Sequence, residues 1–214
     1  MRNTTVDDLR GRIAPLGLDL SIDVLSKLLD YLSLLAKWNA VFNLTAIRDV
    51  QQMLVQHLFD CLSILPTLDR LEPARVLDVG SGGGLPGLVI AIARPYWAVT
   101  LNDIVSKKTA FLLQVKAALS LDNVEVVNAR VETIDATAPF DVITCRAFAD
   151  LSDFYRLSQH LLAQKGHFVA MKGVARADEL ARLTEQGLAI EVIPLRVPEL
   201  DAQRHLIVAH RPHP

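Results

Sequence analysis

The sequence predicts an α/β fold with a mostly parallel sheet, helices on both faces, a C-terminal antiparallel hairpin and an N-terminal helical cap. Three observations predict it. Short apolar runs alternate with helical patterns after Arg75, the last two strand-like runs are joined by a short link, and the first seventy or so residues have almost no β-branched runs. We therefore expect a helical cap over residues 1–70 and a sheet domain over 71–214.

Two helical patterns stand out in the cap. From Ile22 to Leu35 the apolar residues recur at helical spacing, and Ser21 before them is a residue type that often caps a helix N-terminus. A second pattern runs from Met53 to Leu65 and should stop at Pro66. Residues 38–45 break the period between the two patterns, and we expect the chain to turn there.

The sheet domain begins with alternating strands and helices. The expected strands are 75–79, 98–101, 124–128, 141–145 and 167–171, and the expected helices are about 86–93, 107–119 and 151–162. The last two strands, 190–197 and 205–210, are joined by residues 198–204. That link is too short for the crossover helix that parallel strands require, so this pair should form an antiparallel hairpin.

Composition limits the class of protein. The chain has 214 residues, of which 51% are hydrophobic, so it can bury a large core and is not a disordered chain. The formal net charge of −2 lacks the basic balance of many nucleic-acid-binding proteins, so such a partner would need a local patch. Two cysteines, no apolar leader, no membrane-length apolar run and no heptad seam predict a cytoplasmic monomer without a metal.

The most informative stretch is Asp78-Val79-Gly80-Ser81-Gly82-Gly83-Gly84-Leu85-Pro86-Gly87, between the first expected strand and its helix. Glycines let a backbone approach a ligand closely, and a helix N-terminus offers unpaired N–H groups to polar or anionic atoms. Asp103 follows the next strand, where a carboxylate can accept both hydrogens of a ribose diol. A glycine-rich turn without a ligand is the alternative.

Two nucleotide-like ligands fit this stretch. Gly82, Gly84 and Gly87 satisfy the dinucleotide pattern G-x-G-x-x-G, which alone is a weak signal. Asp78, Gly80, Gly82 and Gly84 satisfy the D-x-G-x-G-x-G pattern of S-adenosylmethionine enzymes, in which Asp78 could help to recognise the amino-acid end of the cofactor. The expected terminal hairpin and the short remaining chain both favour S-adenosylmethionine.

Five motifs occur together in order: Leu44-Thr45-Ala46-Ile47-Arg48-Asp49, the glycine stretch 78–87, Cys145-Arg146-Ala147-Phe148-Ala149, Met171-Lys172-Gly173 and Arg204-His205-Leu206. With them the sequence resembles, over nearly its whole length, the small-subunit ribosomal RNA methyltransferase G family, also called glucose-inhibited division protein B. The resemblance implies a Rossmann-like class I methyltransferase fold. It also implies methyl transfer from S-adenosylmethionine to N7 of a guanine in 16S ribosomal RNA. Cys145 stands where serine is usual and Gly83 where proline is common, and neither change removes a charge or a donor.

The same resemblance implies a set of cofactor contacts, namely Gly80, Leu85, Val131, Glu132 and Arg146. We add Gly82 from the glycine pattern and Asp103 from its position after the second strand. Each charged member has a structural alternative. Glu132 could be a solvated carboxylate, Asp103 a helix cap and Arg146 part of an internal salt bridge.

RNA would be met by cations beside the expected strand ends and hairpin turns, namely Lys107, Lys108, Lys172 and Arg204. Solvated side chains are the alternative for the two paired lysines. No catalytic base is assigned, because N7 carries a lone pair and no proton, and only Asn43 and Arg146 are candidates for positioning the base. The other functions left open are a small-molecule or protein methyltransferase and a non-catalytic RNA-binding protein.

Three further sets of residues receive structural interpretations. Cys145 lacks the sequence context of a nucleophile and is expected to be a small buried hydrophobe. His57 and Asp60 share a helical face and are expected to be a surface pair. Trp38 and Phe42 are expected to join the core more readily than to stack on a base.

Overall fold

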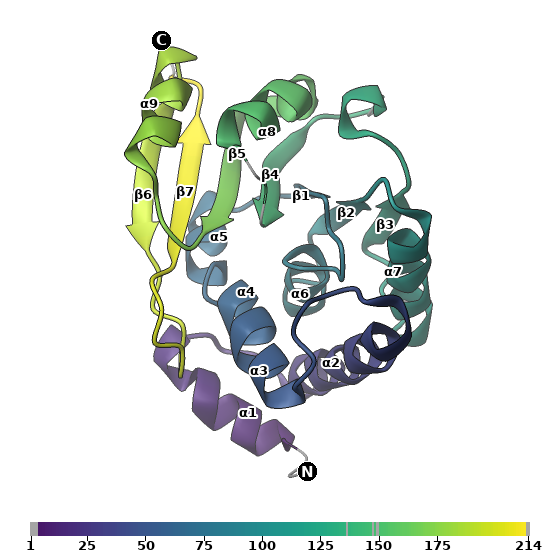
Figure 1. The fold of residues 1–214 in the computed structure, drawn as a ribbon. Coiled ribbons are helices and arrows are strands. Elements are labelled where there is room, and N and C mark those ends of the chain that lie inside the picture. The colour runs from purple at the N-terminus through teal and green to yellow at the C-terminus, as the bar shows by residue number, and fades with distance from the viewer. Residues whose placement is uncertain (1–3, 136, 147, 149, 213–214) are drawn as a thin grey trace.

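A seven-stranded sheet forms the centre of the molecule, with strand order β3-β2-β1-β4-β5-β7-β6 (Figure 1). The computed structural model describes residues 4–135, 137–146, 148 and 150–212. The strands are β1 (Arg75–Val79), β2 (Ala98–Asn102), β3 (Val124–Val127), β4 (Phe140–Arg146), β5 (Leu162–Lys172), β6 (Ala189–Pro194) and β7 (His205–His210). The first five are parallel, and β7 runs antiparallel to both β5 and β6. The predicted parallel sheet and its terminal hairpin are confirmed.

Successive residues of a strand point to opposite sides of the sheet, so the apolar strands present buried side chains on both faces. Helices cover each of these faces. Val76 packs in one core with α6 (Gly87–Ala93), α7 (Ser106–Ala118) and the N-terminal helices. Leu77 packs in a second core with α8 (Leu151–Ser158) and α9 (Ala177–Glu185). The short 3₁₀ helices η3 (Val131–Thr133) and η4 (Gln159–Leu161) follow β3 and α8.

The N-terminal helices share the first of these cores with the sheet. They are α1 (Val6–Ile13), the 3₁₀ helix η1 (Ala14–Leu16), α2 (Ile22–Phe42), α3 (Val50–Met53), the π-helix η2 (Leu54–Phe59), α4 (Asp60–Leu62) and α5 (Leu65–Leu71). Leu28 of α2, Leu58 of η2 and Ile90 of α6 belong to one buried cluster. The cap therefore packs directly on the sheet domain (Figure 1). Among the described residues, no helix is long and apolar enough to cross a membrane.

The loop between β6 and β7 also reaches the N-terminal helices. It descends from the hairpin to α1 (Figure 1), where Glu199 pairs with Arg12 at 2.7 Å. The guanidinium makes two hydrogen bonds to that carboxylate. This contact joins the first helix to the loop of the C-terminal hairpin.

Several local expectations are wrong at their edges. Helix α2 continues through the expected break as far as Phe42, because the Asn39 side chain is satisfied by hydrogen bonds to Thr45 and Ile47. Pro66 does not end a helix but stands in the first turn of α5, a position where its missing N–H is tolerated. The sequence patterns do not predict helices α1 and α9, since each presents only a few apolar residues.

Candidate functional site

The loop between β1 and α6 turns bare backbone toward open space. Gly80, Gly82 and Gly84 have φ values of +71°, +57° and +88°, which residues with side chains rarely adopt. A Cβ at Gly80 would meet no atom within 4 Å, and one at Gly82 would meet only the Gly80 carbonyl oxygen at 3.8 Å. Side chains would fill this space, so the loop forms a cradle that can admit a ligand.

Asp78, in β1 just before the glycine loop, stabilises this cradle by hydrogen bonds. Its Oδ2 accepts a hydrogen bond from the Gly87 N–H at 2.9 Å, and its backbone carbonyl accepts one from the Ser81 hydroxyl at 3.0 Å. Complete burial raises the pKa of Asp78 to about 6, and the Gly87 N–H opposes that rise. The buried side chain supports the shape of the loop.

Helix α2 supports the same loop from the side of the cap. The buried hydroxyl of Tyr31 donates to the Gly83 carbonyl at 2.7 Å. A Cβ at position 83 would lie 3.0 Å from a methyl group of Leu35, which is a tighter contact than usual. Glycine at position 83 therefore suits the close approach of α2. Nothing in the local sequence indicates this contact, because Tyr31 and Gly83 are 52 residues apart.

Asp103 lies beside the cradle, at the carboxyl end of β2. Its Oδ2 accepts a hydrogen bond from the Gly82 N–H at 3.0 Å, and its Oδ1 accepts one from the Val105 N–H at 2.9 Å. Lys108 Nζ is 3.6 Å from Oδ2. Asp103 thus connects the glycine loop to the start of α7, but it is not the helix cap considered for it, because the N-cap of α7 is Val105.

The remaining expected cofactor contacts lie in the glycine loop and in the segment that follows β3. Leu85 is a buried member of the glycine loop. Val131 and Glu132 follow β3 in η3, where Val131 is buried and the Glu132 side chain is 40% exposed. The Asn128 side chain donates to the Asp103 carbonyl at 2.8 Å, which links the end of β3 to Asp103. Val131 and Glu132 therefore follow a segment that is bonded to Asp103 through Asn128.

Arg146 ends β4 and reaches the cap. Its Nη1 lies 3.2 Å from His57 Nδ1, 3.4 Å from the Gln56 carbonyl oxygen and 3.8 Å from Asp60 Oδ2. Asp60 Oδ1 lies 3.3 Å from Arg204 Nε. The internal salt bridge considered for Arg146 is present, and its guanidinium is still partly exposed at the carboxyl edge of the sheet.

The interpretation of His57 and Asp60 as a surface pair is wrong. Their exposed fractions are 5% and 4%, because this helical face is turned toward Arg146. Burial, and then the nearby Arg146 charge, lower the pKa of His57 to about 4. Burial raises the pKa of Asp60, and Arg146 and Arg204 oppose the rise.

The chain matches the family model of rRNA small subunit methyltransferase G over residues 24–207. It belongs to this family. The Ribosomal RNA small subunit methyltransferase G of Burkholderia multivorans is 58% identical over 198 residues, which cover 91% of this chain and 87% of that protein. The Burkholderia vietnamiensis protein of the same name is 58% identical over 186 residues, 85% of this chain and 82% of that protein. The expected resemblance, enzyme class and cofactor are confirmed: the chain is a methyltransferase that uses S-adenosylmethionine.

Solved structures confirm the Rossmann-like methyltransferase fold. The O-methyltransferase TomG from Streptomyces achromogenes, in complex with SAM, has a TM-score of 0.60 at 16% identity over 86% of this chain and 90% of that one. The glycopeptide N-methyltransferase MtfA, complexed with sinefungin, has a TM-score of 0.61 at 13% identity over 72% of this chain and 87% of that one. At these identities the likeness is one of fold alone.

The four cations expected to bind RNA are not equivalent. Lys107 is exposed in the first turn of α7, whereas the other three have carboxylate partners within the chain. The pairs are Lys108 with Asp103 at 3.6 Å, Lys172 with Glu179 at 3.0 Å and Arg204 with Asp60 at 3.3 Å. A phosphate would have to share or replace these carboxylates.

Other singled-out residues have local structural roles. Asn43 ends α2 with φ at +51°, and its side chain accepts a hydrogen bond from Arg48 at 2.8 Å. Cys145 is buried, and burial raises the pKa of its thiol, as suits a small hydrophobe. Trp38 packs 5.5 Å from the Phe111 ring, whereas Phe42 is 38% exposed. Ala147 and Ala149 of the 145–149 motif lie outside the described residues.

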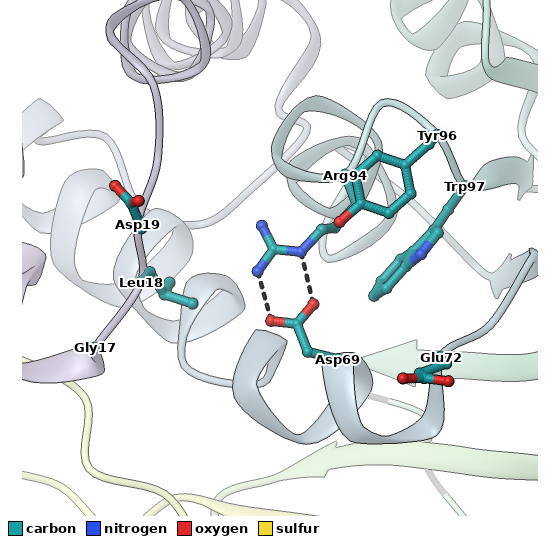
Figure 2. Close-up of a pocket in the computed structure, with 8 residues that line it drawn as sticks. All are labelled: Gly17, Leu18, Asp19, Asp69, Glu72, Arg94, Tyr96 and Trp97. Carbon is teal, nitrogen blue, oxygen red and sulfur yellow. Dashed lines mark hydrogen bonds and ion pairs between the residues drawn. The ribbon is translucent and has the colours of Figure 1, made fainter.

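A cavity of about 590 Å³ lies at the other end of α6 from the glycine loop. Figure 2 shows the Arg94 guanidinium bound by the Asp69 carboxylate, with Asp19 and Glu72 on the surrounding wall. This pair ties α5 to the C-terminal end of α6. Because the glycine loop is at the N-terminal end of α6, the cavity is separate from the cradle.

Gly82→Asn should weaken S-adenosylmethionine binding at least about tenfold while the protein stays folded. Asparagine tolerates positive φ better than other residues with side chains, and its side chain would enter the open cradle. Isothermal titration measures the affinity. Gly17→Asn is the matched control, since Gly17 also has a positive φ of +66° and open space at its Cβ. Equal affinities of the two variants would remove Gly82 from the cofactor site.

Lys172→Ala should lower the free energy of unfolding by about 3 kcal/mol, because it leaves the buried Glu179 carboxylate without its cation. The double variant Lys172→Met with Glu179→Leu should recover most of that loss, since it removes both charges. Urea unfolding of the single and double variants measures the difference. If the single and the double variant lose equal free energy of unfolding, the charge of Glu179 is not the cause, and the Lys172–Glu179 pair contributes nothing beyond packing.

The stability that neutral His57 provides should fall as the pH falls from 6.5 to 4. The unfolded chain takes up a proton near 6.5, whereas folded His57 does so only at about 4, so acid favours unfolding by about 3 kcal/mol over this range. The gap in unfolding free energy between wild type and His57→Gln should narrow by that amount between pH 7 and pH 4. A gap that is constant with pH would contradict the lowered pKa.

Proposed function

We propose that this enzyme transfers the methyl group of S-adenosylmethionine to N7 of a guanine in 16S ribosomal RNA. The observation that carries the proposal is the family match over residues 24–207, which includes both the cap and the sheet. The acceptor atom and the residues that hold each ligand are part of the proposal. So are a monomeric state and a cytoplasmic location, which the two buried free cysteines suit.

The residues around the cradle fit the parts of the cofactor. When bound, S-adenosylmethionine supplies an electrophilic methyl group on a positively charged sulfur. The bare backbone of Gly80 and Gly82, beside Leu85, leaves room for it, and the Asp103 carboxylate can accept hydrogen bonds from ribose hydroxyls. Val131 and Glu132 offer an apolar side chain and a carboxylate to the adenine, and Arg146 offers a cation to the cofactor carboxylate.

The ionisable groups described near Arg146 support an acceptor that needs no base. His57 Nδ1 and Asp60 Oδ2 both face the Arg146 guanidinium, so neither is placed as a free proton acceptor. Guanine N7 has a lone pair and carries no proton, so its attack on the methyl group requires only that the two be aligned at close distance. In this proposal, the chain acts by positioning both ligands at the carboxyl edge of the sheet.

Lys107, Lys108, Lys172 and Arg204 are proposed to contact phosphates of the RNA, and Asn43 is proposed to help position the base. Phosphates are the suitable targets for these cations, since 7-methylguanine is itself cationic and a fixed positive charge beside the ring would oppose its formation. Arg204 and Arg146 share the Asp60 carboxylate, which partly offsets their charge near the acceptor.

Methyl transfer to isolated small subunits, to protein-free 16S ribosomal RNA and to unrelated RNA tests the proposal. Radiolabelled S-adenosylmethionine reports transfer, and mass spectrometry of the digested RNA identifies 7-methylguanosine. We expect one modified guanine in at least one of the two ribosomal substrates and none in unrelated RNA. Modification at another atom, or of protein or small molecules alone, would overturn it.

Lys107→Ala should reduce the slope of log affinity for RNA against log salt by roughly 0.7, the amount expected for one phosphate contact to a single strand. Its affinity for S-adenosylmethionine should not change, because Lys107 is exposed on α7. Lys165→Ala is the matched control. Lys165 is also exposed, but it lies near the N-terminal end of β5, away from the carboxyl edge where the RNA is proposed to bind. Equal slopes for the two variants would place the RNA elsewhere.

A further inference from the structure

The loop between α2 and α3 is fixed in front of the carboxyl edge by one buried side chain. Asn39 Oδ1 accepts a hydrogen bond from the Thr45 N–H at 2.8 Å, and its Nδ2 donates to the Ile47 carbonyl at 2.8 Å. The exposed fraction of Asn39 is only 2%. The backbone around Thr45 is therefore held in one conformation relative to α2.

The contacts of His57 determine which of its nitrogens carries the proton. Nδ1 lies 3.1 Å from the Gln56 carbonyl oxygen, which can only accept, and 3.2 Å from Arg146 Nη1, which can only donate. A proton on Nδ1 would face the positive charge of the guanidinium, and the Gln56 carbonyl already accepts from Arg146 at 3.4 Å, so we assign Nδ1 as the acceptor. The proton of the neutral ring is then on Nε2, which is 2.7 Å from Thr45 Oγ1 and donates to it. Arg146 thus sets the tautomer of His57, and burial keeps the ring neutral at physiological pH.

This tautomer in turn directs the Thr45 hydroxyl. A hydroxyl has two lone pairs and one hydrogen. Thr45 Oγ1 accepts from His57 Nε2 at 2.7 Å and from the Ile47 N–H at 3.2 Å, so both lone pairs are used. What is left is one hydrogen to donate, on a side chain that is partly exposed. Thr45 is separated from the Arg146 guanidinium by the width of one imidazole ring.

We infer that the Thr45 hydroxyl donates a hydrogen bond to O6 of the target guanine and so selects guanine over purines with an amino group at that position. The inference rests on the proposed function. On the major-groove edge of guanine, O6 is an acceptor next to N7, whereas adenine has an amino donor there. A donor held by His57 and Ile47 cannot turn into an acceptor, so an amino group facing it would be left unpaired.

A neutral donor also suits the chemistry at N7. Methylation makes the base cationic, and a hydroxyl can orient O6 without placing a fixed charge beside the ring. His57 acts through Thr45 and is a positioning residue, whereas Thr45 itself touches the substrate. The other acceptor that could take this hydrogen bond is a phosphate oxygen, and the experiment separates the two.

The experiment compares RNA that carries guanine at the target position with RNA that carries 2,6-diaminopurine, which keeps N7 and replaces O6 by an amino group. Wild type should methylate the guanine RNA with about tenfold higher kcat/KM than the diaminopurine RNA, since the Thr45 donor would face an amino group and be left unpaired. Thr45→Val should lose that preference. Its kcat/KM on the guanine RNA should fall roughly tenfold, and its kcat/KM on the diaminopurine RNA should not change. Thr45→Ser keeps a hydroxyl and should restore the preference.

Asn39→Ala is the matched control, because it loosens the loop without removing the hydroxyl and should lower both rates by the same factor. A wild type without preference, or a Thr45→Val variant that keeps it, would overturn the inference. An equal loss on both RNAs would assign Thr45 to a phosphate. If wild type methylates no guanine N7, the proposed function itself fails, and the inference fails with it.

Discussion

The carboxylate of Asp60 is buried between two arginines from distant parts of the chain. Asp60 belongs to α4 in the cap, Arg146 ends β4, and Arg204 directly precedes β7. Burial of a carboxylate disfavours its charged form, and the two guanidinium groups oppose that effect. Removal of one partner from a buried ion pair is strongly destabilising. The cap, the parallel sheet and the terminal hairpin are therefore held together at the edge where cofactor and RNA are proposed to meet.

The cap takes part in building the site and is not an added layer. It supplies Tyr31, which binds the glycine loop, and His57, which contacts Arg146. Its loop at 43–49 presents Thr45, whose hydroxyl is oriented through the same histidine. The sheet alone would leave the Gly83 carbonyl and the Arg146 guanidinium without these partners. A division of the chain at residue 70 therefore separates residues that act together, although it follows the change in sequence pattern.

The sequence was most informative where the chemistry is local. Buried parallel strands appear as apolar runs, and the glycines of the cradle are required by their own backbone angles, so both could be predicted. Helix α9 could not, because its nine residues include only two leucines, Leu180 and Leu183. The spacing of His57 and Asp60 places them on one helical face, but it does not reveal that Arg146 lies opposite. Long-range partners leave no local pattern, and most of the support for the site comes from them.

The distribution of charge bears on the proposed RNA contacts of a chain whose net charge is −2. Lys108, Lys172 and Arg204 each lie beside a carboxylate that also has a structural role. A phosphate that meets one of them replaces an anion that is already present, so its gain in free energy is smaller than at an unpaired cation. Single contacts of this kind bind an arbitrary strand weakly at physiological salt. In the proposed function, binding therefore becomes favourable only when several phosphates reach their cations together, which favours an RNA held in one folded shape.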